Sequence, residues 1–268
     1  MFGSFFKSVP RWTMDRAKQH IAAHKLDEYN LIDVRQPEEY AEGHIPGATL
    51  IPLGELPDRI DEIDRSKLTL VYCRSGGRAG NGTALLTQAG FEQAHNIGGL
   101  PEWNGLVASG APEAGMAVFD AARKPEEYVA VAWAMEEGAR LFYLELGQRF
   151  DELKAMFEPM AAGEERHRDR LAELHGELTG QAGDPVLQGG AELMEGGIDR
   201  AEALAWARQR EAVDVIEFAA VMEANAHDRY IHVGRAVGGA TERAFLKLAE
   251  AEKVHLDQLM RAFGQRLG

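Results

Sequence analysis

One pair of residues, Glu-x-x-His, occurs twice in this chain within stretches of helical periodicity. The first pair is Glu164 and His167, and the second is Glu252 and His255. Residues three apart lie on the same face of a helix, so each pair presents a carboxylate and an imidazole to one point. Such groups are rarely buried unless they are paired or bind a metal. The pattern therefore predicts a helical bundle built around a polar centre.

The helical region also contains an internal repeat. Residues 135–143 recur 87 residues later as residues 222–230, and the two Glu-x-x-His pairs are 88 residues apart. Both copies of the first segment share the pattern Glu-x-x-Ala-x-x-x-Tyr, which selects Glu136 over its neighbour Glu137 and matches it with Glu223. A duplicated pair of helices explains why the two displacements agree.

The repeat supplies six side chains of types that bind metals. Four carboxylates that converge in a core repel one another, and each unpaired buried charge is costly, so divalent cations are the natural compensation. Mixed carboxylate and imidazole ligands suit iron or manganese, and zinc would also bind. The alternative is a set of ordinary charges on solvated helix faces, where Glu-x-x-His is common. The candidate metal ligands are Glu136, Glu164, His167, Glu223, Glu252 and His255.

Only helical periodicity remains beyond about residue 120. It predicts four long helices and one short helix. A Gly-rich stretch over residues 180–197 separates the second long helix from the short one, and a connection of this length allows a crossover rather than a simple hairpin. The expected helices cover residues 125–150, 152–179, 200–208, 211–235 and 240–265.

The first part of the chain has a different pattern. Short apolar runs at residues 30–34 and 68–72 alternate with amphipathic stretches such as residues 78–90, which predicts an α/β unit. Loop-forming residues at 110–115 and a proline at the expected start of the next helix separate the two parts. We expect domains over residues 1–115 and 124–268, joined by a linker over residues 116–123.

The single cysteine of the chain, Cys73, lies between a predicted strand and a predicted helix. A loop at this place turns backbone N–H groups and the positive helix end toward one point, which forms a cradle for anions. We expect Cys73 at the rim of this cradle, where the amides and two guanidinium groups stabilise its thiolate. The alternative is an inert buried thiol. The predicted substrate-binding residues are Arg74, Ser75, Gly76, Gly77 and Arg78.

Over about residues 12–107 the chain resembles the rhodanese family of sulfurtransferases. The resemblance is carried by the loop 73–78, by the segments 31–35 and 43–48, and by Gly98 and Gly99. It implies a parallel sheet flanked by helices and a catalytic Cys73 that carries sulfur as a persulfide. Thiosulfate, polysulfide or a small persulfide is the implied donor, and a thiol or cyanide is the implied acceptor. The short Cys-x4-Arg loop favours sulfur over phosphate as the bound group.

Over about residues 124–265 the chain resembles the rubrerythrin-like branch of the ferritin-like superfamily. This implies an all-α four-helix bundle that holds two iron ions and acts on peroxide or oxygen. It also implies that Glu164 and Glu252 bridge the metals, that Glu136 and Glu223 are terminal ligands, and that the bundle forms a homodimer. A chain with one cysteine cannot hold a rubredoxin-like iron domain, so an external electron donor protein is needed. A further glutamate of the third rubrerythrin helix is replaced here by Ala226.

The charge and hydropathy of the chain limit its partners. With 29 basic and 43 acidic residues, a net charge of −14 argues against nucleic acid or an anionic membrane surface as the main partner. No apolar run has the length of a signal peptide or a membrane span, so we expect a cytoplasmic protein. Small sulfur-containing anions are the expected substrates of a thiosulfate sulfurtransferase. The alternative function is an iron-binding or iron-sensing bundle joined to a non-catalytic sulfur carrier.

Overall fold

The computed structural model describes residues 10–111, 117–185 and 192–267. The chain divides into two compact units, Met1–Pro112 and Glu113–Gly268, and each is a separate body. The predicted domain boundary at residues 115 and 116 lies outside the described residues. In the described ranges no helix has both the length and the apolar character that a membrane crossing needs.

The first unit is built on a four-stranded parallel sheet with the order β2-β1-β3-β4. The central pair is held in register by five partner positions, including Leu31 opposite Leu70. Each of these two strands is buried at all but one position, as expected of a parallel sheet that helices cover on both sides. The strands are β1 Tyr29–Asp33, β2 Thr49–Leu50, β3 Leu68–Cys73 and β4 Ala94–Gly99.

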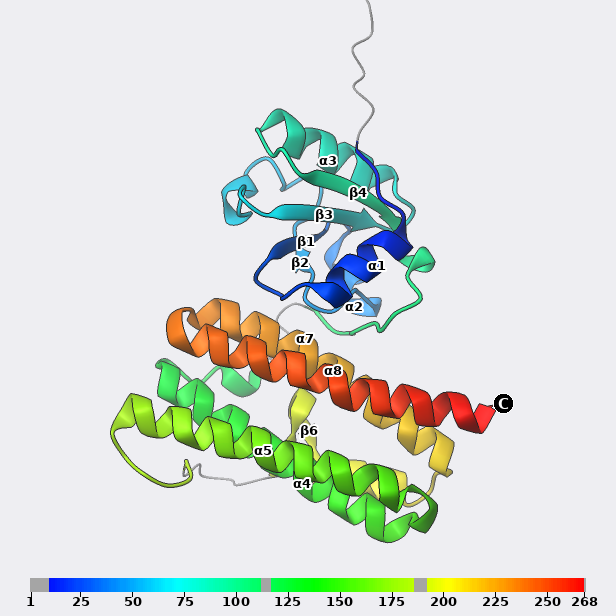
Figure 1. Ribbon diagram of the computed structural model, residues 1–268, viewed down its shortest axis with the longest axis vertical. Helices are drawn as coiled ribbons and strands as arrows, with labels where there is room; N and C mark the ends of the chain where they lie inside the picture. Colours follow the sequence, from blue (N-terminus) through cyan, green and yellow to red (C-terminus); the bar gives the residue numbers. More distant parts are fainter. Residues whose placement is uncertain (1–9, 112–116, 186–191, 268) are drawn as a thin grey trace, which may run out of the picture. The chain divides into compact units, whose positions relative to one another are not determined.

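Helices cover this sheet and close its core. Figure 1 shows α3 on one side of the sheet and α1 on the other. Side chains from the strands and from α3, such as Ile32, Val71 and Leu86, form one buried cluster. The predicted α/β fold with flanking helices is therefore confirmed. The helices are α1 Met14–Ala23, α2 Pro37–Glu42 and α3 Gly77–Gln88.

The second unit is a bundle of four long helices, as the periodicity predicted. Each predicted helix end lies within two residues of the observed one. Proline starts the first of these helices, and Gly180, in a left-handed conformation, ends the second. The helices are α4 Pro125–Arg149, α5 Lys154–Thr179, α6 Arg200–Ala207, α7 Ala212–Val237 and α8 Gly239–Leu267.

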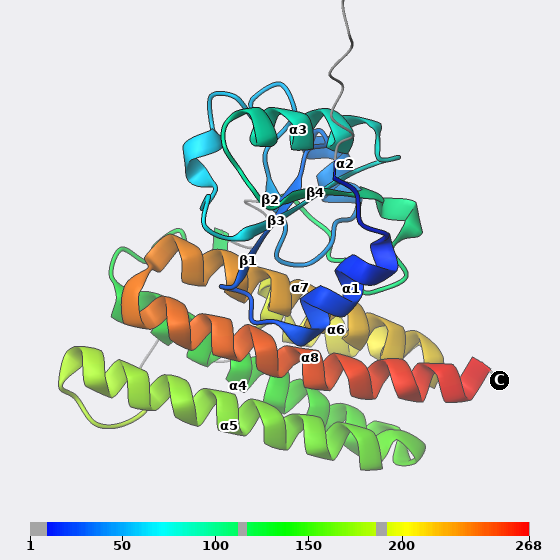
Figure 2. The same cartoon turned by 45° about the horizontal axis from the view of Figure 1, so that its top comes forward.

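The long helices form two pairs, α4 with α5 and α7 with α8, which Figure 2 shows as two neighbouring layers. The connection from α5 to α7 contains a small antiparallel hairpin that the sequence analysis did not predict. Its strands are β5 Leu193–Met194 and β6 Ile198–Asp199, with Glu195–Gly197 as the turn. The hairpin contacts both α4 and α7, and Figure 1 shows β6 between the two helix pairs.

The segment expected to be a linker, residues 116–123, belongs in part to the bundle. A short turn forms at Ala117–Phe119, and Phe119 is only 1% exposed. Its ring stacks on Tyr128 at the start of α4 with the ring centroids 5.8 Å apart. The expectation of a simple linker is therefore wrong for this turn, because a large aromatic side chain gains more by burial than by solvation.

The hairpin and α4 pack so closely that one glycine determines the fit. A Cβ atom on Gly138 would lie 2.2 Å from the carbonyl oxygen of Leu193, whereas a Cβ on Gly147 would meet nothing closer than 3.8 Å. We predict that Gly138→Ala destabilises the second unit by about 1–3 kcal/mol through overpacking. Gly147→Ala, in the same helix, should be neutral or stabilising by up to about 1 kcal/mol because alanine favours helix. Thermal unfolding of both variants measures the difference, and equal effects would contradict the close packing.

Candidate functional sites

The loop that follows β3 forms the first candidate site. β3 ends at Cys73 and α3 begins at Gly77, with Gly76 between them at a φ of +87°. The backbone N–H of Gly76 donates to Sγ of Cys73 over 3.1 Å. Cys73 is 1% exposed, whereas Arg74 and Ser75 are exposed. The expectation that Cys73 lies at the rim is therefore wrong: it forms the floor of the loop, because its strand belongs to the buried sheet.

Residues of strand β4 contact this loop and hold it in place. A Cβ atom on Gly99 would lie 2.5 Å from the carbonyl oxygen of Arg74, so only glycine allows this approach. The side-chain amide of Asn96 donates to the carbonyl oxygen of Gly76 over 3.1 Å, and its oxygen accepts from Gly98 N–H over 2.9 Å. Sequence reasoning missed Asn96 as a support of the loop. The sequence signal that could have identified Asn96 is a polar residue within a mostly buried strand.

The Arg78 guanidinium is held by a carboxylate from α2. Its two terminal nitrogens donate to the oxygens of Glu39 over 2.6 and 2.7 Å, which is a bidentate pair. These hydrogen bonds lower the pKa of Glu39 to about 2, so the pair stays charged at neutral pH. Arg78 is among the substrate-binding residues that the sequence predicts. The pairing instead favours support of the loop, and Arg74 remains the exposed cation of the loop.

The six predicted metal ligands meet in the core of the second unit. They form two groups, in each of which one ligand atom per residue lies within 4.8 Å of the others. Glu164 and Glu252 belong to both groups. Each shared carboxylate comes from one Glu-x-x-His pair, so the two halves of the repeat contribute equally. The groups are Glu136, Glu164, His167 and Glu252, and Glu164, Glu223, Glu252 and His255.

Both imidazoles face the shared carboxylates. Nδ1 of His167 lies 3.1 Å from an oxygen of Glu164 and 3.0 Å from one of Glu252. Nδ1 of His255 lies 2.9 Å from Glu164 and 3.2 Å from Glu252. The ring of His255 fits only because Gly163 has no side chain, since a Cβ there would lie 2.1 Å from Nε2. Gly163 thus makes room for a ligand, which the spacing of the ligands alone did not reveal.

Two buried tyrosines connect the two halves of the repeat. The hydroxyl of Tyr143 donates to Glu223, and that of Tyr230 donates to Glu136. Each glutamate of the Glu-x-x-Ala-x-x-x-Tyr pattern therefore accepts a hydrogen bond from the tyrosine of the other copy. Both tyrosines are fully buried, so they are core residues that also orient a carboxylate.

The charges of the cluster are unevenly distributed. Burial raises the pKa of Glu136 well above its ordinary value and that of Glu223 to about 8. The pKa values of Glu164 and Glu252 are lowered, because the neighbouring imidazoles outweigh the cost of burial. The same carboxylates raise the pKa values of His167 and His255 against the effect of burial. Protons thus compensate the buried charge in the metal-free protein, and metal ions would replace them.

The donor atoms are arranged as ligands of a metal ion rather than as hydrogen-bond partners of one another. Among the described residues, Oε1 of Glu164, Oε2 of Glu223, both oxygens of Glu252 and Nδ1 of His255 are buried without a hydrogen-bond partner. Nδ1 of His255 lies 2.9 Å from Glu164 yet is not aligned for a hydrogen bond with it. Donor atoms that face a common ion have this arrangement. A further carboxylate, Glu195, is also fully buried with both oxygens unpartnered, and sequence reasoning missed it.

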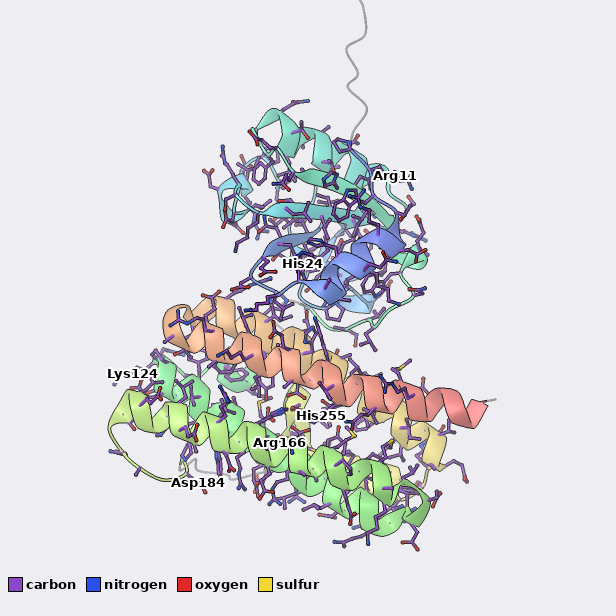
Figure 3. The ribbon with its side chains drawn as sticks, viewed as in Figure 1. Arg11, His24, Lys124, Arg166, Asp184 and His255 are labelled. Carbon is purple, nitrogen blue, oxygen red and sulfur yellow. The ribbon has the colours of Figure 1, made fainter. Side chains whose placement is uncertain are left out.

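A cleft between α5 and α8 reaches the metal-ligand cluster. Its volume is about 390 Å³, and His167 and His255 are among its lining residues. Figure 3 shows His255 on α8 and Arg166 on the facing helix α5. Six of its lining residues are apolar and three are cations, although the whole chain has a net charge of −14. These cations are Arg166, Arg170 and Lys247.

The fold and the two sites define a chain that joins an α/β domain with a loop cysteine to a helical bundle with a buried carboxylate and imidazole cluster. Residues 13–106 match the rhodanese-like domain family, and residues 127–263 match the rubrerythrin family. The chain therefore belongs to the rubrerythrin family and carries a rhodanese-like domain ahead of the bundle. The resemblance seen in the sequence is confirmed for both domains. A rubrerythrin domain implies iron binding, in agreement with the buried ligand groups.

Three curated relatives are similar to the rhodanese-like domain. The Bacillus subtilis protein YtwF is 40% identical over 79 residues, which cover 30% of this chain and 77% of YtwF. A sulfurtransferase of Allochromatium vinosum is 39% identical over 74 residues, 27% of this chain and 69% of the relative. The thiosulfate sulfurtransferase PspE of Escherichia coli is 38% identical over 73 residues, 26% of this chain and 70% of PspE.

The two tyrosine contacts should contribute equally to metal binding. Tyr143→Phe and Tyr230→Phe each remove the donor to one carboxylate and leave its packing intact. We expect each variant to bind Mn²⁺ at least about tenfold more weakly, as is usual when a partner of a ligand is lost. Tyr128→Phe, at the partly exposed stacking contact with Phe119, is the control and should bind as wild type does. Titration followed by electron paramagnetic resonance measures the affinity. Unchanged affinity would mean that both tyrosines serve only to pack the core.

Proposed function

We propose that the rhodanese-like domain is a sulfurtransferase that forms a persulfide on Cys73. The observation that carries this proposal is the contact of the Gly76 N–H with Sγ of Cys73 at the start of α3. An amide donor and the positive end of a helix stabilise an anionic sulfur at this point. The similarity to two sulfurtransferases supports the same reaction class.

The proposed reaction proceeds in two steps. The Cys73 thiolate attacks the outer sulfur of thiosulfate, which forms a new S–S bond, breaks the old one and releases sulfite. The acceptor, cyanide or a thiol, then attacks the outer sulfur of the Cys73 persulfide. With cyanide the product is thiocyanate, and the Cys73 thiolate leaves as the displaced group. Loop amides stabilise the sulfur anion in both steps.

The two arginines of the loop have different proposed roles. Arg74 is exposed and orients the anionic donor, whereas Arg78 is held by Glu39 and keeps the loop in place. Ser75, Gly76 and Gly77 contribute backbone around the bound anion. We propose small sulfur-containing anions as the substrates, with thiosulfate favoured by the similarity to a thiosulfate sulfurtransferase.

We propose that the bundle holds two iron ions in a carboxylate-bridged centre. The observation that carries this proposal is the membership of Glu164 and Glu252 in both ligand groups, which is the arrangement of bridging ligands. Glu136 with His167 and Glu223 with His255 are the terminal ligands. Iron held there supplies the one-electron redox chemistry needed to reduce peroxide or oxygen. Tyr143 and Tyr230 keep the terminal carboxylates oriented through their hydroxyl groups.

We propose that the cleft between α5 and α8 admits a small oxidant to this centre. His167 and His255 line the cleft, and its apolar side chains limit the access of bulk water to the ligands. Reduction of hydrogen peroxide to water takes two electrons and two protons. The single cysteine cannot supply an iron–sulfur relay, so an external reductant provides the electrons.

The two sites should work independently. We predict that Cys73→Ser abolishes thiosulfate-to-cyanide sulfur transfer and leaves the iron content unchanged. Glu164→Gln should lower the iron content and leave sulfur transfer unchanged, because it removes a shared ligand but no part of the loop. Thiocyanate formation and metal analysis of anaerobically purified full-length protein measure both outcomes. Wild type without turnover, but with persulfide transferred to Cys73 from a protein donor, would favour a sulfur carrier instead.

Filling the cleft should slow peroxide consumption without removing iron. Ala251 lines the cleft and Ala155 is exposed on α5. We predict that Ala251→Phe lowers kcat/KM for hydrogen peroxide by about tenfold, equivalent to roughly 1.4 kcal/mol. Ala155→Phe, the same change on the surface, should have no effect. Equal rates in both variants would exclude this route, and iron-loaded wild type that consumes neither peroxide nor oxygen would favour an iron-binding or iron-sensing bundle.

A further inference from the structure

The hairpin in the connection between α5 and α7 delivers a carboxylate into the bundle. Glu195 follows strand β5 directly and begins the turn, in which Gly196 and Gly197 have positive φ angles of +87° and +67°. The close approach of Leu193 to Gly138 places this strand two residues beyond the ligand Glu136 on α4. The turn also contacts α7, which carries Glu223. Glu195 therefore enters between the helices that carry the two terminal carboxylates.

The side chain of Glu195 is buried beside the metal-ligand cluster, outside the two ligand groups. It is 0% exposed, and neither carboxylate oxygen has a hydrogen-bond partner within the described ranges. Its strongest charge interaction is with Glu223, followed by Glu252, Glu136 and Glu164. As an anion, a carboxylate that is removed from water, unpartnered and close to four others is unfavourable, so either a proton or a metal cation must compensate it.

No side chain in the described part of the chain donates a hydrogen bond to either oxygen of Glu195. Arg229, which is 8% exposed and lies six residues beyond Glu223 on α7, is a buried cation that Glu195 attracts. Its Nε and Nη1 are also buried without hydrogen-bond partners, so it does not pair with Glu195. Burial and the four carboxylates together raise the pKa of Glu195 well above its ordinary value, despite the attraction of Arg229.

We propose that Glu195 is a further carboxylate ligand of the di-metal centre, supplied by the connection rather than by a long helix. This inference rests on the metal centre proposed above. It assigns the hairpin a function, since the hairpin carries this carboxylate to the side of α4 and α7. The cleft is lined by α5 and α8. A ligand supplied from the side of α4 and α7 therefore leaves the cleft open to the oxidant.

A fifth carboxylate has a predictable effect on the redox state. Two divalent ions and four carboxylates balance in charge, so an added anionic ligand favours the oxidised ions, which carry more positive charge. Glu195 should therefore lower the reduction potential of the iron-loaded protein. Removal of its charge should raise that potential.

The test uses full-length protein with Glu195→Gln, which keeps the size of the side chain, and Glu192→Gln, an exposed position in the same segment, as the control. We expect Glu195→Gln to bind Mn²⁺ at least about tenfold more weakly and to raise the reduction potential of the iron form. The metal-free variant should unfold at the same or a higher temperature than metal-free wild type, because the repulsion between Glu195 and the four other carboxylates is lost. A purely structural role would lower the stability instead.

A compensating variant makes the test specific. Ala226 is buried on α7, three residues beyond Glu223 and on the same helix face. Ala226→Glu in the Glu195→Gln background restores a carboxylate, and we expect it to recover part of the Mn²⁺ affinity. Unchanged affinity and potential in Glu195→Gln would overturn the proposal while leaving a metal-binding wild type intact. Wild type that binds no metal would instead refute the proposed metal centre itself.

Discussion

The second unit depends on the burial of negative charge at one point. Glu136, Glu164, Glu223 and Glu252 are fully buried, and their mutual repulsion must be offset for the helices to pack. The offset comes from two imidazoles, two tyrosine hydroxyls and, in the function we propose, two metal ions. The bundle is therefore both a scaffold for the centre and a structure that the centre stabilises.

The first unit solves a related problem with backbone groups. Sulfur at Cys73 faces the N–H of Gly76 and the start of α3 rather than a metal ion. Asn96 and Gly99 on the neighbouring strand support the loop, and the pair of Arg78 with Glu39 ties it to α2. Both units thus create a place where an anion is favourable inside a protein core, one with amide dipoles and the other with cationic groups.

Several features of the sites could be predicted because they follow from local spacing. Glu-x-x-His places two ligands on one helix face wherever that helix packs, and the repeat pairs Glu136 with Glu223. The cysteine loop follows from an apolar run, two glycines and a helix start. Helix ends agreed closely because proline and glycine mark them through their own backbone preferences.

The sequence by itself determined the two fold classes, the helix ranges and which residue types gather as candidate ligands, since periodicity and spacing act within one element. Only the tertiary structure decided that Cys73 lies at the floor of its loop, that Gly163 makes room for His255, and that each tyrosine serves the other half of the repeat. It also revealed Glu195, which lies in a segment outside the internal repeat. These features depend on contacts between elements distant in the chain, and no local pattern encodes them.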